Sequence, residues 1–171
     1  VELERPGMTA SPDLLRALRA KLRRDMPITR ALGLRVVGHE GGGLVLSSPL
    51  EPNINHKGTA FAGSLNATAT LAGWGTIWLA LREHGIRSHV VIQDSTVHYF
   101  RPVTGGFTAR CKAPSATAIE RLVKSVAKKG RGRIELDVTV ADASGDAVRF
   151  HGRYVAFIVA TPAERRLQSA S

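Results

Sequence analysis

The sequence predicts an α+β fold in which an antiparallel β-sheet wraps around one long central helix. Two observations lead to this prediction. Residues 58–81 contain no Lys, Arg, Asp or Glu, although the chain as a whole is 22% charged. Further along, residues 132–142 and 147–160 alternate apolar and polar side chains, as antiparallel strands with one buried face do. Those strands need an apolar partner, and only the uncharged segment is long enough to supply it.

The composition is that of one globular domain. The 171 residues are 43% hydrophobic, enough to bury a substantial core. The only cysteine, Cys111, excludes an internal disulfide and favours a reducing, cytoplasmic compartment, and the first residues lack the apolar run of a secretory signal. The net charge of +10 attracts anionic partners such as nucleic acid, acidic lipid or a phosphorylated small molecule. A solvated basic surface accounts for it equally well.

A basic amphipathic helix is predicted over residues 13–24, in front of the sheet. Its leucines fall on one stripe at helical spacing: Leu14, Leu15, Leu18 and Leu22. Ser11 is the candidate N-cap, and Pro27 ends the helix. Packing on its own domain is favoured over lying on a membrane. We divide the chain into three parts: an N-terminal helical extension at 1–30, the sheet domain at 31–160 and a flexible tail at 161–171.

The uncharged segment has the length of a membrane span, which is the alternative to a buried helix. A helix from Gly58 to Arg82 would be about 36 Å long. Polar side chains interrupt it, however: Ser64, Asn66, Thr68, Thr70 and Thr76. Amphipathic strands follow it and no second span exists in the sequence, so an enclosed helix of small residues on which a sheet can pack closely is favoured.

Strands account for most of the remaining structure. Alternating, β-branched or aromatic runs predict them at 34–39, 43–49, 89–103, 107–113, 132–142 and 147–160. Turns are predicted at glycines 41–43 and at residues 143–146. Residues 116–129 place four apolar side chains on one face of a helix, but a bent strand is the alternative, and the sequence leaves both open.

Several motifs resemble those of hotdog-fold thioesterases, whose fold is a sheet around one helix. "NHKGTAFAGSL" is similar to the beginning of their central helix, "DSTVHYFRPV" to the next strand, and "KKGRGRIELDVTVADASGDAVRFHGRYVAF" to the final hairpin. The combination of "GTAFAGSL", "LAGWG" and "YFRPV" most resembles the YiiD-type C-terminal thioesterase domain, over about residues 30–160. The resemblance implies hydrolysis of acyl-CoA or acyl-carrier-protein thioesters in fatty acid metabolism. It also implies no cofactor beyond the CoA or phosphopantetheine of the substrate, and a homodimer or dimer of dimers with its site between subunits.

The start of the central helix is where the resemblance would place the thioester carbonyl. Backbone N–H groups at a helix start are unpaired and lie at the positive end of the helix dipole. They can hold a carbonyl oxygen as negative charge develops on it. Gly63 would make this contact, with Ala62 and Ser64 on either side. Tight packing of the helix on the sheet is the alternative reason for a glycine at this position.

Asn55 and His56 precede this helix and are candidates to act on the attacking water. An amide at position 55 would orient the water, and a histidine near neutral pKa would serve as a base. The alternative for both residues is a role in capping the turns of the loop.

One position departs from the better-known relatives. Phenylacetate-type hotdog thioesterases carry a carboxylate seven residues beyond the glycine that corresponds to Gly63, where this chain has Thr70. A threonine can orient water but cannot act as a general base at neutral pH. Asp94 is the nearest substitute, unless it pairs with Arg101, and the adjacent Ser95 is a candidate for substrate binding. The departure leaves open a second function, that of an acyl-thioester-binding or partner domain without catalysis.

Two further groups are candidates for substrate binding. Trp74 shares a helix face with Trp78 and would line an acyl tunnel or the dimer seam, although core packing is favoured. The resemblance implies that Lys129, Arg131 and Arg133 border the CoA entrance, where they suit phosphates or an acidic carrier protein. Nucleic acid is the competing partner, but no base-reading motif accompanies these cations, so none is expected. The histidines lack metal-ligand spacing, so we expect no metal.

Overall fold

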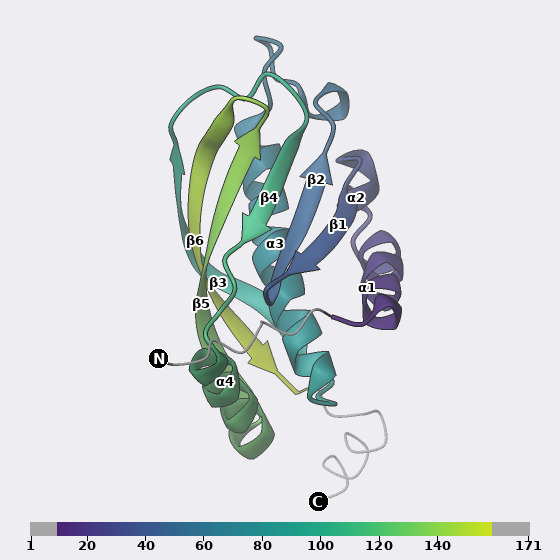
Figure 1. The fold of residues 1–171 in the computed structure, drawn as a ribbon, viewed down its shortest axis with the longest axis vertical. Helices are drawn as coiled ribbons and strands as arrows, with labels where there is room; N and C mark the ends of the chain where they lie inside the picture. Colours follow the sequence, from purple (N-terminus) through teal and green to yellow (C-terminus); the bar gives the residue numbers. More distant parts are fainter. Residues whose placement is uncertain (1–9, 159–171) are drawn as a thin grey trace, which may run out of the picture.

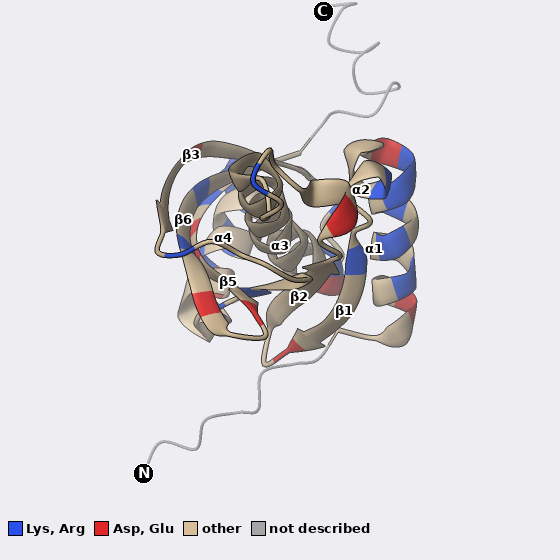
Figure 2. Cartoon of the chain, turned by 90° about the horizontal axis from the view of Figure 1, so that it is seen from above, with Lys and Arg blue, Asp and Glu red and all other residues tan. Residues whose placement is uncertain are grey.

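Residues 10–158 are described by the computed structural model, and they form a six-stranded antiparallel sheet curled around one long helix (Figure 1). The elements in chain order are α1 (Pro12–Asp25), α2 (Ile28–Ala31), β1 (Arg35–Glu40), β2 (Gly43–Ser48), a short 3-10 helix (Glu51–Asn53), α3 (Ala62–Glu83), β3 (His89–Tyr99), β4 (Phe107–Cys111), α4 (Ala116–Lys129), β5 (Arg131–Asp142) and β6 (Gly145–Phe157). The strands lie in the order β1-β2-β4-β5-β6-β3. Seen end-on, the sheet bends around α3, which confirms the predicted architecture (Figure 2).

Helix α1 packs on the domain, as predicted. The Ser11 hydroxyl caps it by accepting the N–H of Leu14 at 3.3 Å. Leu18 and Leu22 are fully buried in the same core as the side chains of α3. The division of the chain at residue 30 stays a prediction, and the predicted tail at 161–171 lies outside the described residues.

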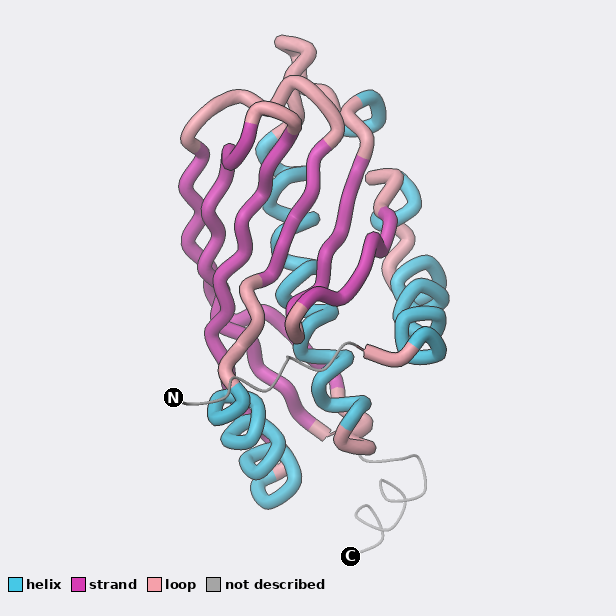
Figure 3. Tube along the Cα trace, in the orientation of Figure 1, coloured by secondary structure: helices cyan, strands magenta, loops and turns pink. Residues whose placement is uncertain are grey.

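The segment at 116–129 is a helix, α4, which decides between the two alternatives. The Ser115 hydroxyl accepts the N–H of Ala118 at its start, and Gly130 ends it with a left-handed φ of 71°. Leu122 and Val126 are its buried side chains. Figure 3 shows α4 at one end of the sheet, inserted between β4 and β5.

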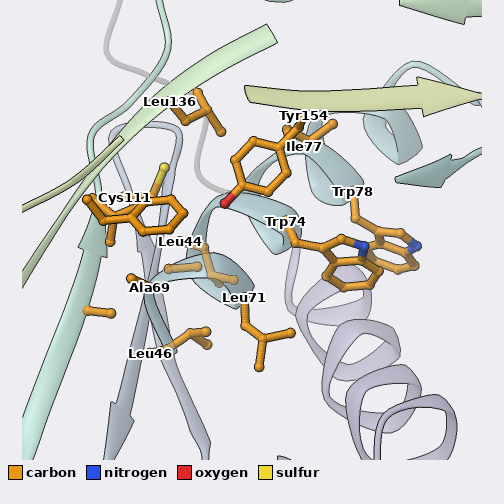
Figure 4. Close-up of a cluster of buried hydrophobic side chains, with 14 of the residues drawn as sticks. Leu44, Leu46, Ala69, Leu71, Trp74, Ile77, Trp78, Cys111, Leu136 and Tyr154 are labelled. Atoms are coloured by element: carbon orange, nitrogen blue, oxygen red, sulfur yellow. The ribbon is translucent and has the colours of Figure 1, made fainter. Parts of the chain in front are cut away.

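Two glycines allow the sheet to close onto α3. The ring of Tyr154 from β6 fills the space where a side chain at Gly73 would lie, and Leu44 from β2 does the same at Gly75. The Tyr154 hydroxyl donates to the backbone carbonyl of Thr70 at 2.9 Å. Figure 4 shows Tyr154 and Leu44 among the buried side chains around the helix. In the part of the chain that the structure describes, no helix combines the length and apolarity needed to cross a bilayer.

The two edge strands of the sheet differ. Strand β1 has 6 residues, and its register with β2 is irregular between Val36 and Gly38. Strand β3 has 11 residues, pairs only with β6, and leaves Val91, Ile92 and Tyr99 36–46% exposed. A long edge strand with apolar side chains is a template for another strand.

The predicted boundaries are accurate to within a few residues, with two larger errors. The central helix begins at Ala62 instead of Gly58, because Gly58 has a left-handed φ of 74° in the preceding turn. The strand predicted to reach residue 103 ends at Tyr99, before Pro102, which has no N–H to donate.

Candidate active site

The start of α3 opens onto a cavity of about 400 Å³. Its walls include Asn55, Lys57, Ala62, Leu65, Tyr99 and Phe100. No side chain caps the helix, and the N–H groups of Ala62 and Gly63 have no acceptor among the described residues. The helix therefore presents unpaired donors and the positive end of its dipole beside the cavity.

Tyr99 connects the end of β3 to the start of α3, and the sequence analysis did not single it out. Its hydroxyl donates to the backbone carbonyl of Ala62 at 3.2 Å, and burial raises the pKa of this phenol. Phe100 beside it is 57% exposed, with the Arg149 guanidinium 5.1 Å from the ring centre. The "YFRPV" motif is the signal that points to both aromatic residues.

Asn55 holds the loop before α3 in shape. Its Oδ1 accepts the N–H groups of Lys57 and Thr59 at 2.8 and 3.3 Å, and its Nδ2 donates to Thr59 Oγ1 at 2.9 Å. Both ends of the amide are thus engaged in the turn, as the capping alternative requires. His56 is exposed and is not part of the cavity wall. The structure therefore brings Asn55, but not His56, to the candidate site.

Gly63 differs from the glycines deeper in α3. A Cβ atom at Gly63 would overlap the ring of Phe61, which is 54% exposed and supplies the three nearest atoms. Tight helix–sheet packing therefore explains Gly73 and Gly75 but not Gly63. Ser64, the next residue, is buried.

A polar face runs down α3 from Gly63. Asn66 and Thr70 follow it at intervals of three and four residues, so the three residues share one side of the helix. Both are half-buried, and the buried Oδ1 of Asn66 has no donor among the described residues. Trp74 is the next residue along this face, four positions after Thr70.

Asp94 lies away from the start of α3. Its carboxylate is 3.1 Å from Nη1 of Arg153, the residue opposite it in register on the outer face of the sheet. Ser95 lies opposite Gly152, is exposed, and is not part of the cavity wall. Arg101, the other predicted partner of Asp94, pairs with Asp142 at 2.6 Å. Asp94 therefore does not contribute to the cavity of its own chain.

Trp74 is packed in the core and also borders a second cavity, away from the start of α3. Its side chain is 7% exposed, and its ring stacks on Trp78 with 6.5 Å between centroids. Its Nε1 donates to the backbone carbonyl of Val90, near the beginning of β3, at 2.9 Å. Figure 4 shows the two indoles side by side on α3.

The predicted phosphate-binding cations lie at the other end of the sheet from the cavity. Lys129, Arg131 and Arg133 are all exposed. Arg131 lies opposite Phe157, which in turn lies opposite His89 at the beginning of β3. These cations and the start of α3 are therefore not brought together within one chain. No set of three potential metal ligands occurs among residues 10–158.

Comparisons with known proteins agree with this fold. Residues 15–158 match the model of the family described as "Putative thioesterase (yiiD_Cterm)". A solved structure from Chlorobaculum tepidum, a protein of unknown function, is 30% identical with a TM-score of 0.83, over 88% of this chain and 98% of that one. A "putative thioesterase" from Shewanella oneidensis is 28% identical with a TM-score of 0.78, over 86% and 100% of the two chains. The PaaI protein of E. coli, from the phenylacetic acid degradation operon, shares the fold at 15% identity and a TM-score of 0.61, over 87% and 96%.

Proposed function

Because the chain belongs to the YiiD-type C-terminal thioesterase family, we propose that it hydrolyses acyl thioesters of CoA or of acyl carrier protein. The observation that carries this proposal is the uncapped start of α3 beside a cavity. The N–H groups of Ala62 and Gly63 would hold the thioester oxygen, and their attraction strengthens as the tetrahedral intermediate places negative charge on it.

The site would be completed by a second copy of the chain. Tyr99, at the end of β3, bonds to Ala62 at the start of α3, and Trp74 bonds to Val90 near the beginning of β3. If β3 paired antiparallel with β3 of a second copy, the beginning of each strand would lie beside the end of the other. This pairing would therefore bring Trp74 of one copy close to the helix start of the other. We propose this homodimer, because β3 is the long, apolar, unpaired edge.

The water would be positioned across this subunit boundary. No Asp or Glu lines the cavity at the start of α3 among the described residues. Thr70 lies one turn before Trp74, so in the dimer its hydroxyl would approach the helix start of the other copy. A hydroxyl in that position would orient the attacking water by a hydrogen bond.

The same dimer would join the exposed cations to the site. Lys129, Arg131 and Arg133 lie at the His89 end of the sheet, which would face the other copy's Tyr99 end. They would meet the CoA phosphates or the acidic surface of a carrier protein. The substrate itself supplies the CoA or phosphopantetheine, and we place the reaction in the cytoplasm on the basis of the single, buried Cys111.

The test is release of free thiol from a panel of acyl-CoAs and acyl-carrier proteins. Thr70→Val keeps the shape of the side chain and removes the hydroxyl, so kcat should fall about tenfold with little change in KM. Thr139→Val, the same change on β5 away from the cavity, should leave both constants unchanged. Equal kcat in wild type and Thr70→Val would remove the threonine from the mechanism.

A binding domain without catalysis is the second candidate function. The absence of a carboxylate from the described cavity wall favours it. It predicts saturable acyl-CoA binding with no release of thiol from any substrate of the panel, whereas turnover of any of them excludes it.

A further inference from the structure

A second cavity, of about 340 Å³, lies between α1, the later turns of α3 and the beginning of β3. Its apolar wall includes Trp74, Met26 and Val90, and its charged wall includes Arg82 and Arg87. Its position beside Trp74 places it at the end of β3 that the proposed dimer would bring to the helix start of the other copy.

The two arginines of this cavity have no carboxylate partner among the described residues. Arg82 stacks over the ring of Trp78, 5.1 Å from its centroid, and its buried Nε donates to no group of the described chain. Burial, and secondarily the nearby Arg87, lower the pKa of Arg82, which means that its positive charge is held there at a cost. An anion between the two guanidinium groups would relieve that cost.

The other charges of the wall do not supply this anion. The Asp25 carboxylate is engaged by Lys21 at 2.7 Å and by Arg24 at 2.6 Å. The wall therefore keeps a surplus of positive charge at Arg82 and Arg87. Trp78, which contacts the wall residues Trp74 and Arg82 but does not itself line the cavity, also has a buried Nε1 without an acceptor among the described residues.

The distance along α3 decides which reacting centre this cavity serves. Gly63 and Arg82 are 19 positions apart, or about 28 Å along the helix axis, too far for one short acyl chain. In the proposed dimer the helix start of the other copy would lie level with Trp74, about two turns of helix from Arg82. An acyl group held at that helix start would reach the second cavity.

We propose that this cavity binds the far end of the acyl group and that the preferred substrates are thioesters whose acyl chain ends in a carboxylate. The inference rests on the proposed thioesterase function and its dimer. The methylene groups would pack on Trp74, Met26 and Val90, and the terminal carboxylate would take the paired N–H groups of Arg82 and Arg87. The CoA phosphates would remain with Arg131 and Arg133 on the outer face of the sheet.

The kinetic test uses matched pairs of substrates at fixed ionic strength. Glutaryl-, adipoyl- and suberoyl-CoA are compared with pentanoyl-, hexanoyl- and octanoyl-CoA, which have the same chain lengths without the carboxylate. We expect kcat/KM to favour the best carboxylated substrate by about tenfold or more. Hydrolysis of the uncharged chains with equal or greater kcat/KM would overturn the inference and leave the proposed function intact.

The arginine variants assign the preference to this cavity. Arg82→Gln and Arg87→Gln should each remove most of the preference while leaving kcat/KM for hexanoyl-CoA within about twofold of wild type. Arg16→Gln, on the exposed face of α1, removes the same charge elsewhere and should retain the preference. Because Arg82 packs on Trp78, thermal unfolding of Arg82→Gln is measured alongside, and the exposed Arg87→Gln tests the same point without that contact.

Substrates without the nucleotide separate the two sources of negative charge. Adipoyl and hexanoyl N-acetylcysteamine thioesters carry no phosphate, so the preference for the adipoyl group and its loss in Arg82→Gln should persist. If the effect of Arg82→Gln disappears with these substrates, the cavity binds a CoA phosphate and the inference fails.

Tryptophan fluorescence gives a readout that needs no catalysis. The chain has 2 tryptophans, of which Trp74 lines this cavity and Trp78 stacks on Trp74. Adipate should change the fluorescence saturably in wild type and weakly or not at all in Arg82→Gln, and hexanoate should have less effect than adipate.

Thiol release from no substrate would overturn the proposed function and the acyl assignment together. Thiol release without any response to adipate would count against the cavity alone.

Discussion

The two halves of α3 differ in what surrounds them. At Gly73 and Gly75 the helix is enclosed by its own chain, because Tyr154 and Leu44 fill the space beside these glycines. The first turns, by contrast, have no capping side chain and adjoin the exposed Phe61. The comparison teaches that one helix separates two tasks. Its two enclosed glycines stabilise the fold, and its start is left uncapped where chemistry and a second copy are proposed.

The largest effect is expected from breaking the proposed β3 pairing. Ile92→Lys places a charge on this edge, so the protein should become monomeric and kcat/KM should fall about a hundredfold or more, because the site loses its second chain. Light scattering and thiol release measure the two effects. Val37→Lys, on the other edge strand, should change neither. A fully active Ile92→Lys monomer would show that one chain completes the site.

The next effect is on the enclosed half of the helix. Gly73→Ala introduces a methyl group that overlaps the Tyr154 ring, so the free energy of unfolding should fall by about 2 kcal/mol, even though alanine favours helix. Urea denaturation measures the change. An unchanged midpoint would mean that Tyr154 moves aside without cost.

Gly63→Ala is the matched change at the open end. The nearest atoms to the added methyl group belong to the exposed Phe61 ring, which can move aside, so stability should be unchanged or slightly higher. The methyl group would also crowd the proposed carbonyl site, and kcat/KM should fall about tenfold. If Gly63→Ala lost stability but kept full activity, Gly63 would serve the packing of the fold and not the carbonyl site.

The smallest effect concerns a buried histidine on the enclosed side. The Nδ1 atom of His39 accepts the N–H of Ala10 at 2.8 Å and ties the segment before α1 to β1. Burial lowers the pKa of His39. Its contribution to stability is therefore complete above the unfolded pKa of about 6.5 and is lost as the pH falls through the folded value. The melting temperature should drop by a few degrees over that range.

The contribution of His151 to stability changes with pH in the opposite direction to that of His39, so His151 is replaced in the proteins that test His39. Its hydrogen bond to Asp137 raises its pKa, so its contribution is present below the unfolded pKa and is lost as the pH rises through the folded value. The pH dependence is therefore measured in His151→Gln, with and without His39→Asn. An equal pH dependence in both proteins would show that His39 does not titrate on unfolding.

The sequence was sufficient for the architecture because the signals are long. The uncharged run at 58–81 is the one segment long enough to supply the core helix, and β5 and β6 are 12 and 13 residues long with an alternating pattern. The helix start was misplaced by four residues because Gly58 and Asn55 form a turn whose hydrogen bonds are not visible as a periodic pattern.

The candidate site was less predictable, and Asp94 shows why. Strict alternation after Val90 and Ile92 would turn Asp94 toward α3. A bulge between Ile92 and Asp94 instead turns it to the outer face, where Arg153 binds it. Tyr99 was missed for a different reason, since its contact with Ala62 joins residues 37 positions apart. Whether the remaining predicted residues act in catalysis stays a prediction.

Strand β6 is made last, yet it lies between β5 and β3 in the sheet. On the ribosome, β3 therefore has no strand to pair with until residues up to Phe157 have emerged. Until then the apolar surface of α3 stays partly uncovered, and such exposed surface favours aggregation of the nascent chain. Removing β6 would leave β3 unpaired, and the sheet could not close around α3.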